Sequence, residues 1–556
     1  MDGNTSITGT FSTTDPLNYG NLYLKHYVNG NIFDWDLTSS NSQTGVVDFH
    51  YVKHNLAGNT YFRGRAGGQC DYFGTMLNDP AEVTLITKLG ITGNPLWTNQ
   101  IHDLPMFVFG PCLVLDDQDN VFTTGVFNDT LILGTNTFVN ANTANDNYIA
   151  KFNANGSLGW AVQINTETSV DIQSIVTDNN GALLISGVYS DEFSLLGNII
   201  HTGAGVGVFI IKLDAGGNFV WSRDYPAEDY AYIAMLALDP AGNIYLTAEM
   251  YNLTGTNLQF GSVSIPNSGA DGHTILVKFD QAGTPLWGNS YGSLATGTIS
   301  SSWPTDIKTD LAGNVVIYGW AVDGAVFGND TLANPFQGEY SFYLTKINSN
   351  GNILWTKAIY EKQYDFNYGD LLDLDNAGNV YIGAHFRDSL QLEGNVLGPE
   401  GTDDFLLAKF DNNGVLQWTK TIPANTTDII HSLSVHHNDV LTVAGQAGKD
   451  PWLGPFTIFL QGGNTAILAT CGALPLQIED LKKENISVFP NPANDQIFIR
   501  SDKTWQSAEI MNSTGAIVFE QYNYSPSLDV RDLSPGMYFI RIKCGETYKM
   551  GKFIKE

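Results

Sequence analysis

Several residue types in this chain could in principle carry catalytic or metal chemistry, and their spacing decides whether they do. Ten histidines are scattered along the 556 residues, and only His436 and His437 are adjacent. Zinc sites and metalloproteases need further ligands at fixed spacings, but no CxxC or HExxH motif accompanies this pair. No P-loop motif for phosphate binding is found either. The sequence therefore predicts no catalytic residue, and a surface turn is the simpler interpretation of the pair.

Acidic residues are a second candidate chemistry. The adjacent pairs Asp116-Asp117 and Asp403-Asp404 fall in turns or at strand entries, where solvated carboxylates are common. Asp146, Asp271 and Asp404 each precede a predicted strand. Carboxylate oxygens at such positions could bind calcium, and a turn that leads into a strand is the alternative role. No cofactor is predicted beyond this calcium alternative, and the metal content stays open.

Aromatic residues outside the regular pattern described below are the best candidates for ligand contacts. Rings in loops are the usual platforms for sugars and protein partners. We predict that five of them form a binding surface. The alternative is that they only cover the edges of the sheets predicted below. The five residues are Tyr225, Tyr230, Tyr232, Trp303 and Trp320.

The charge balance limits the partners. The chain has 27 Lys plus Arg and 57 Asp plus Glu, which gives a net charge of −30. Nucleic acid and anionic membrane surfaces would be repelled, so neither is predicted as a partner. Residues 486–556 contain eight residues of each sign, so the charge belongs to the preceding segment and two different domains are expected. No apolar run reaches the length of a membrane span, and no secretory signal opens the chain.

The elements that position all these residues follow from a repeat. A Lys stands nine residues before a Trp six times along the chain, and Lys25 and Trp35 repeat the pattern with one more residue between them. The Trp residues recur every 61 to 68 residues. We assign to them a structural role in the repeat: Trp35, Trp97, Trp160, Trp221, Trp287, Trp355 and Trp418.

Each repeat has the pattern of four short strands joined by Asp/Asn- and Gly-containing turns. A sheet of this size cannot bury both faces alone, whereas radial stacking of such sheets in a β-propeller can. We therefore predict an all-β chain with a propeller over residues 1–472, a linker over 473–485 and a small β-sandwich over 486–556. The strand count favours eight blades, with seven as the alternative. The chain begins in the middle of a repeat, so the start of the native protein stays open.

The last segment resembles the type A C-terminal sorting domain of the type IX secretion system of Bacteroidota. The resemblance rests on Val488-Phe489-Pro490-Asn491-Pro492-Ala493, on Ile510 to Gly515, on Leu533 to Ile540 and on Lys549 to Lys555. It implies export, recognition by the secretion translocon through residues 486–556, and release or display at the outer cell surface. The motif residues that carry it are Pro490, Asn491, Pro492, Gly515, Gly536, Tyr538 and Lys552.

Two further resemblances are less specific. The repeat Asp-x-x-Gly-Asn-x-Tyr followed by Lys-x-Asp-x-x-Gly-x-x-x-Trp resembles the bacterial propeller repeats called SBBP, and its Trp segment is similar to the tryptophan-docking motif of quinoprotein propellers. Quinoprotein dehydrogenases imply adjacent cysteines, which this chain lacks. Three Asp-Ser/Thr-Leu tripeptides resemble acceptors of O-linked glycans in Bacteroidota, with Thr130, Thr331 and Ser389 as the hydroxyl residues.

These observations predict a secreted or surface-displayed propeller that binds a glycan, a peptide or another surface protein and has no catalytic centre of its own. Two alternatives stay open. One is a secreted propeller enzyme acting on glycans, which would require acids, His and Arg to converge at one end of the ring. The other is a scaffold module of a larger adhesin.

Overall fold

The computed structural model describes residues 22–555 except for a set of gaps. The gaps are residues 29–31, 40–45, 56, 73–74, 91–93, 105–111, 167, 252–253, 267–272, 295–301, 323, 336–339, 362–370, 399–403, 423–428, 437–439, 448–464, 472–486, 501–504, 512–516, 523, 526 and 545–546. Within the described part all regular structure is β, and the chain divides into two compact units, Met1–Leu474 and Pro475–Glu556.

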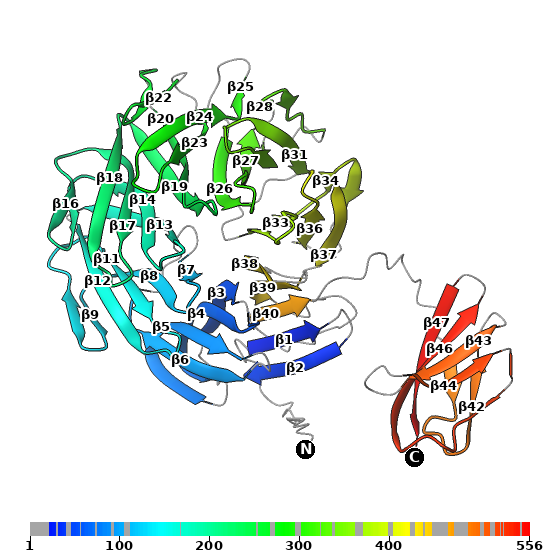
Figure 1. Ribbon diagram of the computed structural model, residues 1–556. Coiled ribbons are helices and arrows are strands. Elements are labelled where there is room, and N and C mark those ends of the chain that lie inside the picture. The colour runs from blue at the N-terminus through cyan, green and yellow to red at the C-terminus, as the bar shows by residue number, and fades with distance from the viewer. Residues whose placement is uncertain are drawn as a thin grey trace. The chain divides into compact units, whose positions relative to one another are not determined.

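The first unit consists of sheets of mainly antiparallel strands arranged around a common axis, which is the architecture of a β-propeller (Figure 1). Blades 1 to 3 contain four strands each, given from the inside outward. Blade 1 is β3 (Val46–His54), β4 (Thr60–Tyr72), β5 (Thr75–Leu89) and β6 (Pro95–Ile101). Blade 2 is β7 (Leu113–Leu115), β8 (Val121–Phe127), β11 (Asp146–Phe152) and β12 (Leu158–Thr166). Blade 3 is β13 (Ser169–Thr177), β14 (Leu183–Ser190), β17 (Val206–Leu213) and β18 (Phe219–Ala227).

Blades 4 to 6 repeat the same order. Blade 4 is β19 (Tyr230–Leu238), β20 (Ile244–Tyr251), β23 (Thr274–Phe279) and β24 (Pro285–Tyr291). Blade 5 is β26 (Ser302–Thr309), β27 (Val315–Val322), β30 (Tyr340–Ile347) and β31 (Ile353–Glu361). Blade 6 is β32 (Leu372–Leu374), β33 (Val380–Phe386), β36 (Asp404–Phe410) and β37 (Leu416–Ile422).

Blade 7 combines the two ends of the first unit. It contains β38 (Ile429–His436), β39 (Val440–Ala447) and β40 (Thr465–Cys471), followed by β1 (Leu22–Val28) and β2 (Ile32–Ser39). Strand β1 pairs with β40 in parallel, from Leu22 opposite Ala466 to Lys25 opposite Ala469. The inner strands contact one another in sequence from β3 to β38, and β38 also contacts β3.

The described strands thus form seven sheets of at least four strands in the first unit, the alternative number rather than the favoured eight. The difference has a physical reason. The first Lys and Trp of the period lie on β1 and β2, and these strands add to the last sheet instead of forming one of their own. The incomplete first and last repeats are thereby merged into one blade.

Short hairpins occupy the connections between the second and third strands of several blades. They are β9 (Thr130–Leu133) with β10 (Asn136–Val139), β15 (Phe193–Leu195) with β16 (Asn198–His201), β21 (Leu258–Phe260) with β22 (Val263–Ile265), β28 (Ala325–Phe327) with β29 (Asp330–Thr331), and β34 (Leu390–Leu392) with β35 (Asn395–Leu397). The short β25 (Ser293–Leu294) pairs with β28. Strands β15 and β34 pair with the outer strands β12 and β31 of the preceding blades, which covers those open edges.

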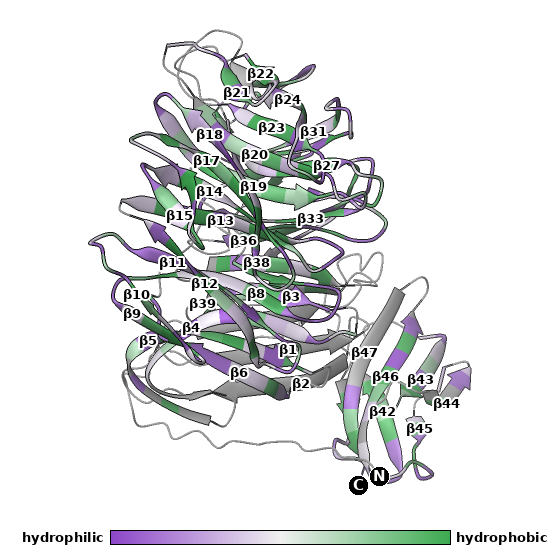
Figure 2. Ribbon diagram, turned by 60° about the vertical axis from the view of Figure 1, so that its left-hand side comes forward, coloured by the Kyte–Doolittle hydropathy of each residue, from purple (hydrophilic) through white to green (hydrophobic). Residues whose placement is uncertain are grey.

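The apolar cores lie between neighbouring sheets. The core between blades 3 and 4, for example, contains Val208, Ile210, Leu246 and Val277, all essentially buried. Figure 2 shows hydrophobic residues concentrated along such strands and hydrophilic residues at the connecting turns. Each blade therefore depends on its neighbours for burial of its faces, as the sequence period predicts.

The second unit packs two antiparallel sheets around one core, the arrangement of a small β-sandwich. The first sheet contains β41 (Ser487–Phe489), β42 (Gln496–Arg500) and β45 (Ser527–Asp529). The second contains β43 (Ser507–Met511), β44 (Ile517–Tyr522), β46 (Gly536–Cys544) and β47 (Thr547–Lys555). Their shared core includes Ile497, Trp505, Ile510 and Phe553, each at most 2% exposed.

Candidate functional sites

The repeated Trp residues attach each blade to the next. The indole N–H donates to a carbonyl oxygen in a turn of the following blade: Trp97 and Trp160 to Ala154 and Ala215 at 3.0 and 3.1 Å, and Trp287 and Trp355 to Ser349 and Asn412, both at 3.2 Å. The ring also covers a glycine with positive φ in that turn, such as Gly351 beneath Trp287. The side chain of Trp35 is outside the described part. The Trp residues with these contacts act in blade packing.

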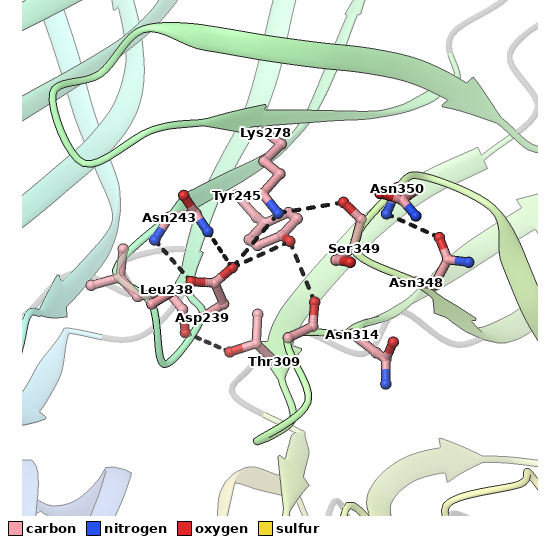
Figure 3. Close-up of polar contacts among 12 residues, drawn as sticks. Leu238, Asp239, Asn243, Tyr245, Lys278, Thr309, Asn314, Asn348, Ser349 and Asn350 are labelled. Atoms are coloured by element: carbon pink, nitrogen blue, oxygen red, sulfur yellow. Dashed lines mark hydrogen bonds and ion pairs between the residues drawn. The ribbon is translucent and has the colours of Figure 1, made fainter.

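The repeated Lys and Asp residues form largely buried ion pairs within blades 2 to 6, and Figure 3 shows the pair of blade 4. In blade 4, Nζ of Lys278 lies 3.7 Å from Asp239 and 4.9 Å from the ring centre of Tyr245. The Asp239 carboxylate also accepts the backbone and side-chain N–H groups of Asn243, both at 2.8 Å. Lys278 donates to the Ser349 carbonyl, which Trp287 also uses. The polar residues of the repeat are therefore satisfied by one another.

Two of the five predicted ligand-binding aromatics belong to the core. Tyr225 lies on β18, is 5% exposed and packs against Phe260 and Phe279. Trp320 lies on β27, is 4% exposed and packs against Phe342. The prediction of a binding role for both is wrong, because the strands extend further than the turn signals indicated and these rings face the neighbouring sheet.

Tyr230 and Tyr232 lie at the start of the inner strand β19 and are 46% and 65% exposed. Tyr232 is the extra residue of a β-bulge, because Ala231 pairs with Met250 and Ile233 pairs with Glu249. Gln173 of blade 3 holds this bulge: its amide donates to the Tyr232 carbonyl and its oxygen accepts the Ala234 N–H, both at 2.8 Å. The backbone that presents Tyr232 is thus fixed from two blades.

The bulge recurs in other inner strands, but its residue differs. His50, Gln173 and His431 occupy the equivalent positions and are 7%, 2% and 8% exposed. Blade 4 alone among these presents an aromatic ring to solvent there. Sequence reasoning selected Tyr232 for its loop-like surroundings, but the bulge itself has no short-range signal.

Trp303 lies at the start of β26, half-buried, beside an unusual acid. Glu249 of the preceding blade is 5% exposed, and its Oε2 has no hydrogen-bond partner among the described atoms. Burial raises the pKa of Glu249 to about 8, and the hydrogen bond from Trp303 acts in the opposite direction. Sequence reasoning missed Glu249, because it sits in the strand that follows a regular Gly-Asn-Ile-Tyr turn.

Among the acidic residues and histidines considered as metal ligands, the described ones have structural roles. Asp146 is buried at the start of β11 and accepts the amide of Gln163 at 2.6 Å and the backbone N–H of Thr166 at 3.1 Å, so it secures a strand entry. Asp404 is equally buried at the start of β36. Asp271 and His437 lie outside the described residues, as does the side chain of His436. Across the described part of the chain, no three His, Cys, Asp or Glu residues are grouped to hold a metal ion.

One motif escaped the sequence analysis. Gly288-Asn289-Ser290-Tyr291-Gly292 has the G-x-S-x-G spacing of a hydrolase nucleophile, which requires a sharp turn between a strand and a helix. Here Gly288 to Tyr291 lie within the outer strand β24, paired with β23. Ser290 is therefore an exposed strand residue rather than a nucleophile at a turn.

The tripeptides with Thr130, Thr331 and Ser389 all lie at rim hairpins. In each, the Leu is buried while the hydroxyl residue is exposed or half-buried, with Leu131, Leu332 and Leu390 at most 3% exposed. The buried Leu anchors each hairpin to the core, and this structural role is enough to explain why the tripeptide recurs, without glycosylation. Glycosylation of these hydroxyls stays a prediction.

The predicted sorting motif brings the two ends of the second unit together. Asn491 accepts the Ile554 N–H through Oδ1 at 2.9 Å and donates from Nδ2 to the Lys552 carbonyl at 3.4 Å. Tyr538 stacks on Phe553 and donates to the Ser534 carbonyl at 2.8 Å. Pro490 and Pro492 flank Asn491 and are exposed, Gly536 begins β46, and Gly515 is outside the described residues.

Comparison with known proteins identifies this second unit. Residues 487–556 match the family described as the secretion system C-terminal sorting domain. This domain marks the chain for export by the type IX secretion system to the extracellular space or the cell surface. No helix of the described part is both long and apolar enough to cross a bilayer.

A curated protein is similar to part of this chain at low sequence identity. An uncharacterised WD repeat-containing protein of Acanthamoeba polyphaga mimivirus is 22% identical over 328 residues, which cover 48% of this chain and 23% of that protein. The chain thus spans about a quarter of the length of this curated relative.

Two solved structures that match this chain share little of its sequence. A quinoprotein alcohol dehydrogenase-like protein from Bacteroides thetaiotaomicron is 12% identical with a TM-score of 0.31, over 68% of this chain and 66% of the other. PorZ, a surface component of the type IX secretion system of Porphyromonas gingivalis, is 10% identical with a TM-score of 0.18, over 93% of this chain and 100% of the other.

Proposed function

We propose that this chain is a secreted or surface-displayed β-propeller that binds neutral glycans at the end of the ring where β19 and β26 begin. The observation that carries the proposal is the exposure of Tyr230 and Tyr232 on a rigid inner strand. Tyrosine rings offer a flat apolar face for sugar rings and a hydroxyl for hydrogen bonds. The strong negative charge of the chain favours an uncharged ligand over a polyanion.

The rigidity of the bulge supports this role. A binding side chain is most effective when its backbone is already fixed, because less conformational entropy is lost on binding. Gln173 provides this fixation through two hydrogen bonds from the neighbouring blade. Bulges commonly serve to redirect a side chain at a functional position.

The test is a binding assay on the full chain with a panel of neutral oligosaccharides, namely glucans, mannans and xylans. We expect Tyr232→Ser to weaken binding about tenfold or more, as for an aromatic contact residue. The matched control is Tyr225→Phe, which removes a buried hydroxyl that has no hydrogen-bond partner. Equal binding by wild type and Tyr232→Ser would refute the site.

The alternatives correspond to other outcomes of the same assay. Turnover of any of these oligosaccharides would identify an enzyme. The absence of any sugar binding would favour the scaffold role or a protein ligand.

A further inference from the structure

Exposed aromatic side chains are concentrated in the sorting domain. Within the described part of the first unit, the exposed large aromatics are Tyr230 and Tyr232, at 46% and 65%. The much smaller second unit exposes five: Phe489, Phe498, Tyr522, Tyr524 and Phe539. An exposed cluster of large apolar groups commonly marks an interaction site.

Two of these rings form one surface. Phe489 on β41 is paired with Phe498 on β42, and the rings stack with centroids 5.7 Å apart at an interplanar angle of 17°. Their exposed fractions are 48% and 39%. Strand alternation places their neighbours Val488, Ile497 and Ile499 against the core, so both phenyl rings lie on the outer face of the sheet.

The sorting motif holds this pair in position. Strand β41 ends at Phe489, and Asn491, two residues later, is bound to β47 through both ends of its amide. The Ala493 N–H then donates to the Ile554 carbonyl at 2.7 Å. The flanking Pro490 and Pro492 have no N–H group to extend the ladder. The motif therefore fixes the end of the strand that carries Phe489.

The charge of the second unit, unlike its exposed aromatic rings, does not indicate a binding partner. Residues 486–556 contain eight basic and eight acidic residues, and the exposed ion pair Arg531–Asp529 neutralises itself. A partner of this domain has no net charge to recognise. Aromatic contacts are the usual centres of binding energy in such interfaces.

We propose that the stacked pair Phe489–Phe498 is the surface by which the type IX secretion machinery recognises this domain. The partner is a protein of that machinery with an apolar groove that accepts two stacked rings. The inference rests on the export role of the sorting domain and is independent of glycan binding by the propeller.

The experiment follows delivery of the full chain in a bacterium with a type IX system, as the fraction of the protein that reaches the surface or the medium. We expect Phe489→Ser with Phe498→Ser to lower this fraction about tenfold, the effect of losing roughly 1.4 kcal/mol of binding energy. The matched control is Tyr522→Ser, which removes a 69% exposed ring from the other sheet, outside the motif stretches. It should leave delivery unchanged.

A milder pair of variants separates recognition from folding. Phe498→Tyr keeps the ring and should preserve delivery, whereas Phe498→Gln should reduce it. Thermal unfolding of each purified full-length variant checks that the fold persists. Normal delivery of the folded double variant, or equal loss with Tyr522→Ser, would overturn the proposal.

Two further results of these experiments would also refute the proposal, and each would show why it fails. If a chain lacking residues 487–556 is delivered normally, the export role itself fails and with it the basis of the proposal. If wild type sediments as a dimer and the double variant as a monomer, with delivery unchanged, the surface contacts a second copy and the proposal is refuted.

Discussion

At the scale of single residues, the molecule contains a few buried charges whose surroundings set their energetics. Glu249 is the clearest case, because one carboxyl oxygen has no partner and burial raises its pKa to about 8. The unfolded chain has an ordinary Glu, with a pKa of 4.5. Between these values the unfolded state releases the proton while the folded state retains it.

This difference predicts a loss of stability with rising pH. The contribution of Glu249 is fully present below about pH 4.5 and falls by roughly 1.4 kcal/mol per pH unit until the folded group ionises near pH 8. Glu249→Gln removes the titration, so the variant should gain in melting temperature relative to wild type between pH 5 and pH 8. Melting curves at both pH values provide the measurement. Glu393→Gln, at a partly exposed carboxylate, serves as the control and should show no such gain.

The Lys–Asp pairs of the repeat give a second residue-scale prediction. In blade 5, Lys346 and Asp310 lie 2.7 Å apart with side chains 1% and 3% exposed. Lys346→Met leaves Asp310 buried without its cation and should cost about 3–5 kcal/mol in the free energy of unfolding. Adding Asp310→Asn should recover part of this loss, because the amide oxygen still caps the turn.

Chemical denaturation of these two variants and of Lys357→Met tests the idea. Lys357 pairs with Glu393 at 2.8 Å on a more exposed surface, so its loss should cost only about 0–1 kcal/mol. Equal effects of Lys346→Met and Lys357→Met would mean that burial of the pair does not determine its contribution.

At the scale of elements, the blade is defined by the docking of one Trp onto the next turn. Gly351 has φ +85°, and an added Cβ would lie 3.2 Å from the Trp287 ring and 2.5 Å from Asn289 Nδ2. Gly351→Ala should therefore destabilise the fold through backbone strain and through displacement of the Trp. The matched control is Gly394→Ala, where φ is +80° and no atom lies within 4 Å of the added Cβ.

The difference between the two Ala variants measures the contact of the turn with Trp287 and Asn289 together. Each pays about 1–2 kcal/mol for a left-handed backbone, and Gly351→Ala should lose about 1–3 kcal/mol more from overpacking. Denaturant midpoints of the purified full chain measure both. If Gly394→Ala is as destabilising as Gly351→Ala, the contact of this turn with Trp287 and Asn289 does not contribute to the joint between blades.

The docking of each Trp onto the following turn explains why the repeat could be predicted from the sequence. Trp97, Trp160 and Trp287 recur because each must reach one carbonyl of the following turn, so the period reports a local contact that is present in nearly every repeat. The four-strand pattern follows for the same reason. By contrast, whether Tyr225 and Trp320 face a core or a loop depends on how far β18 and β27 extend, and no turn residue marks those ends.

The blade number depends on contacts that no local pattern reports. The pairing of β1 with β40 joins residues more than 400 positions apart, and it is parallel, whereas the pairs within blades are antiparallel. The bulge at Tyr232 is equally hidden, because its fixation comes from Gln173 of another blade. The sequence singled out Tyr230 and Tyr232, but only the fold shows that they lie at the start of β19, beside a bulge that Gln173 holds, and their ligand role stays a prediction.

At the scale of the whole molecule, the two units make opposite predictions for truncation. Residues 475–556 form a compact unit with their own core, so removing residues 487–556 should leave the melting temperature of the propeller unchanged. Removing residues 1–39 deletes β1 and β2 and exposes β40 as an open edge in blade 7. That truncation should lower the melting temperature and promote aggregation, because the last sheet loses the strands that join the ends of the unit. Calorimetry and light scattering on both proteins measure these effects. A propeller unaffected by loss of residues 1–39 would show that contacts between blades, rather than the added strands, hold the two ends together.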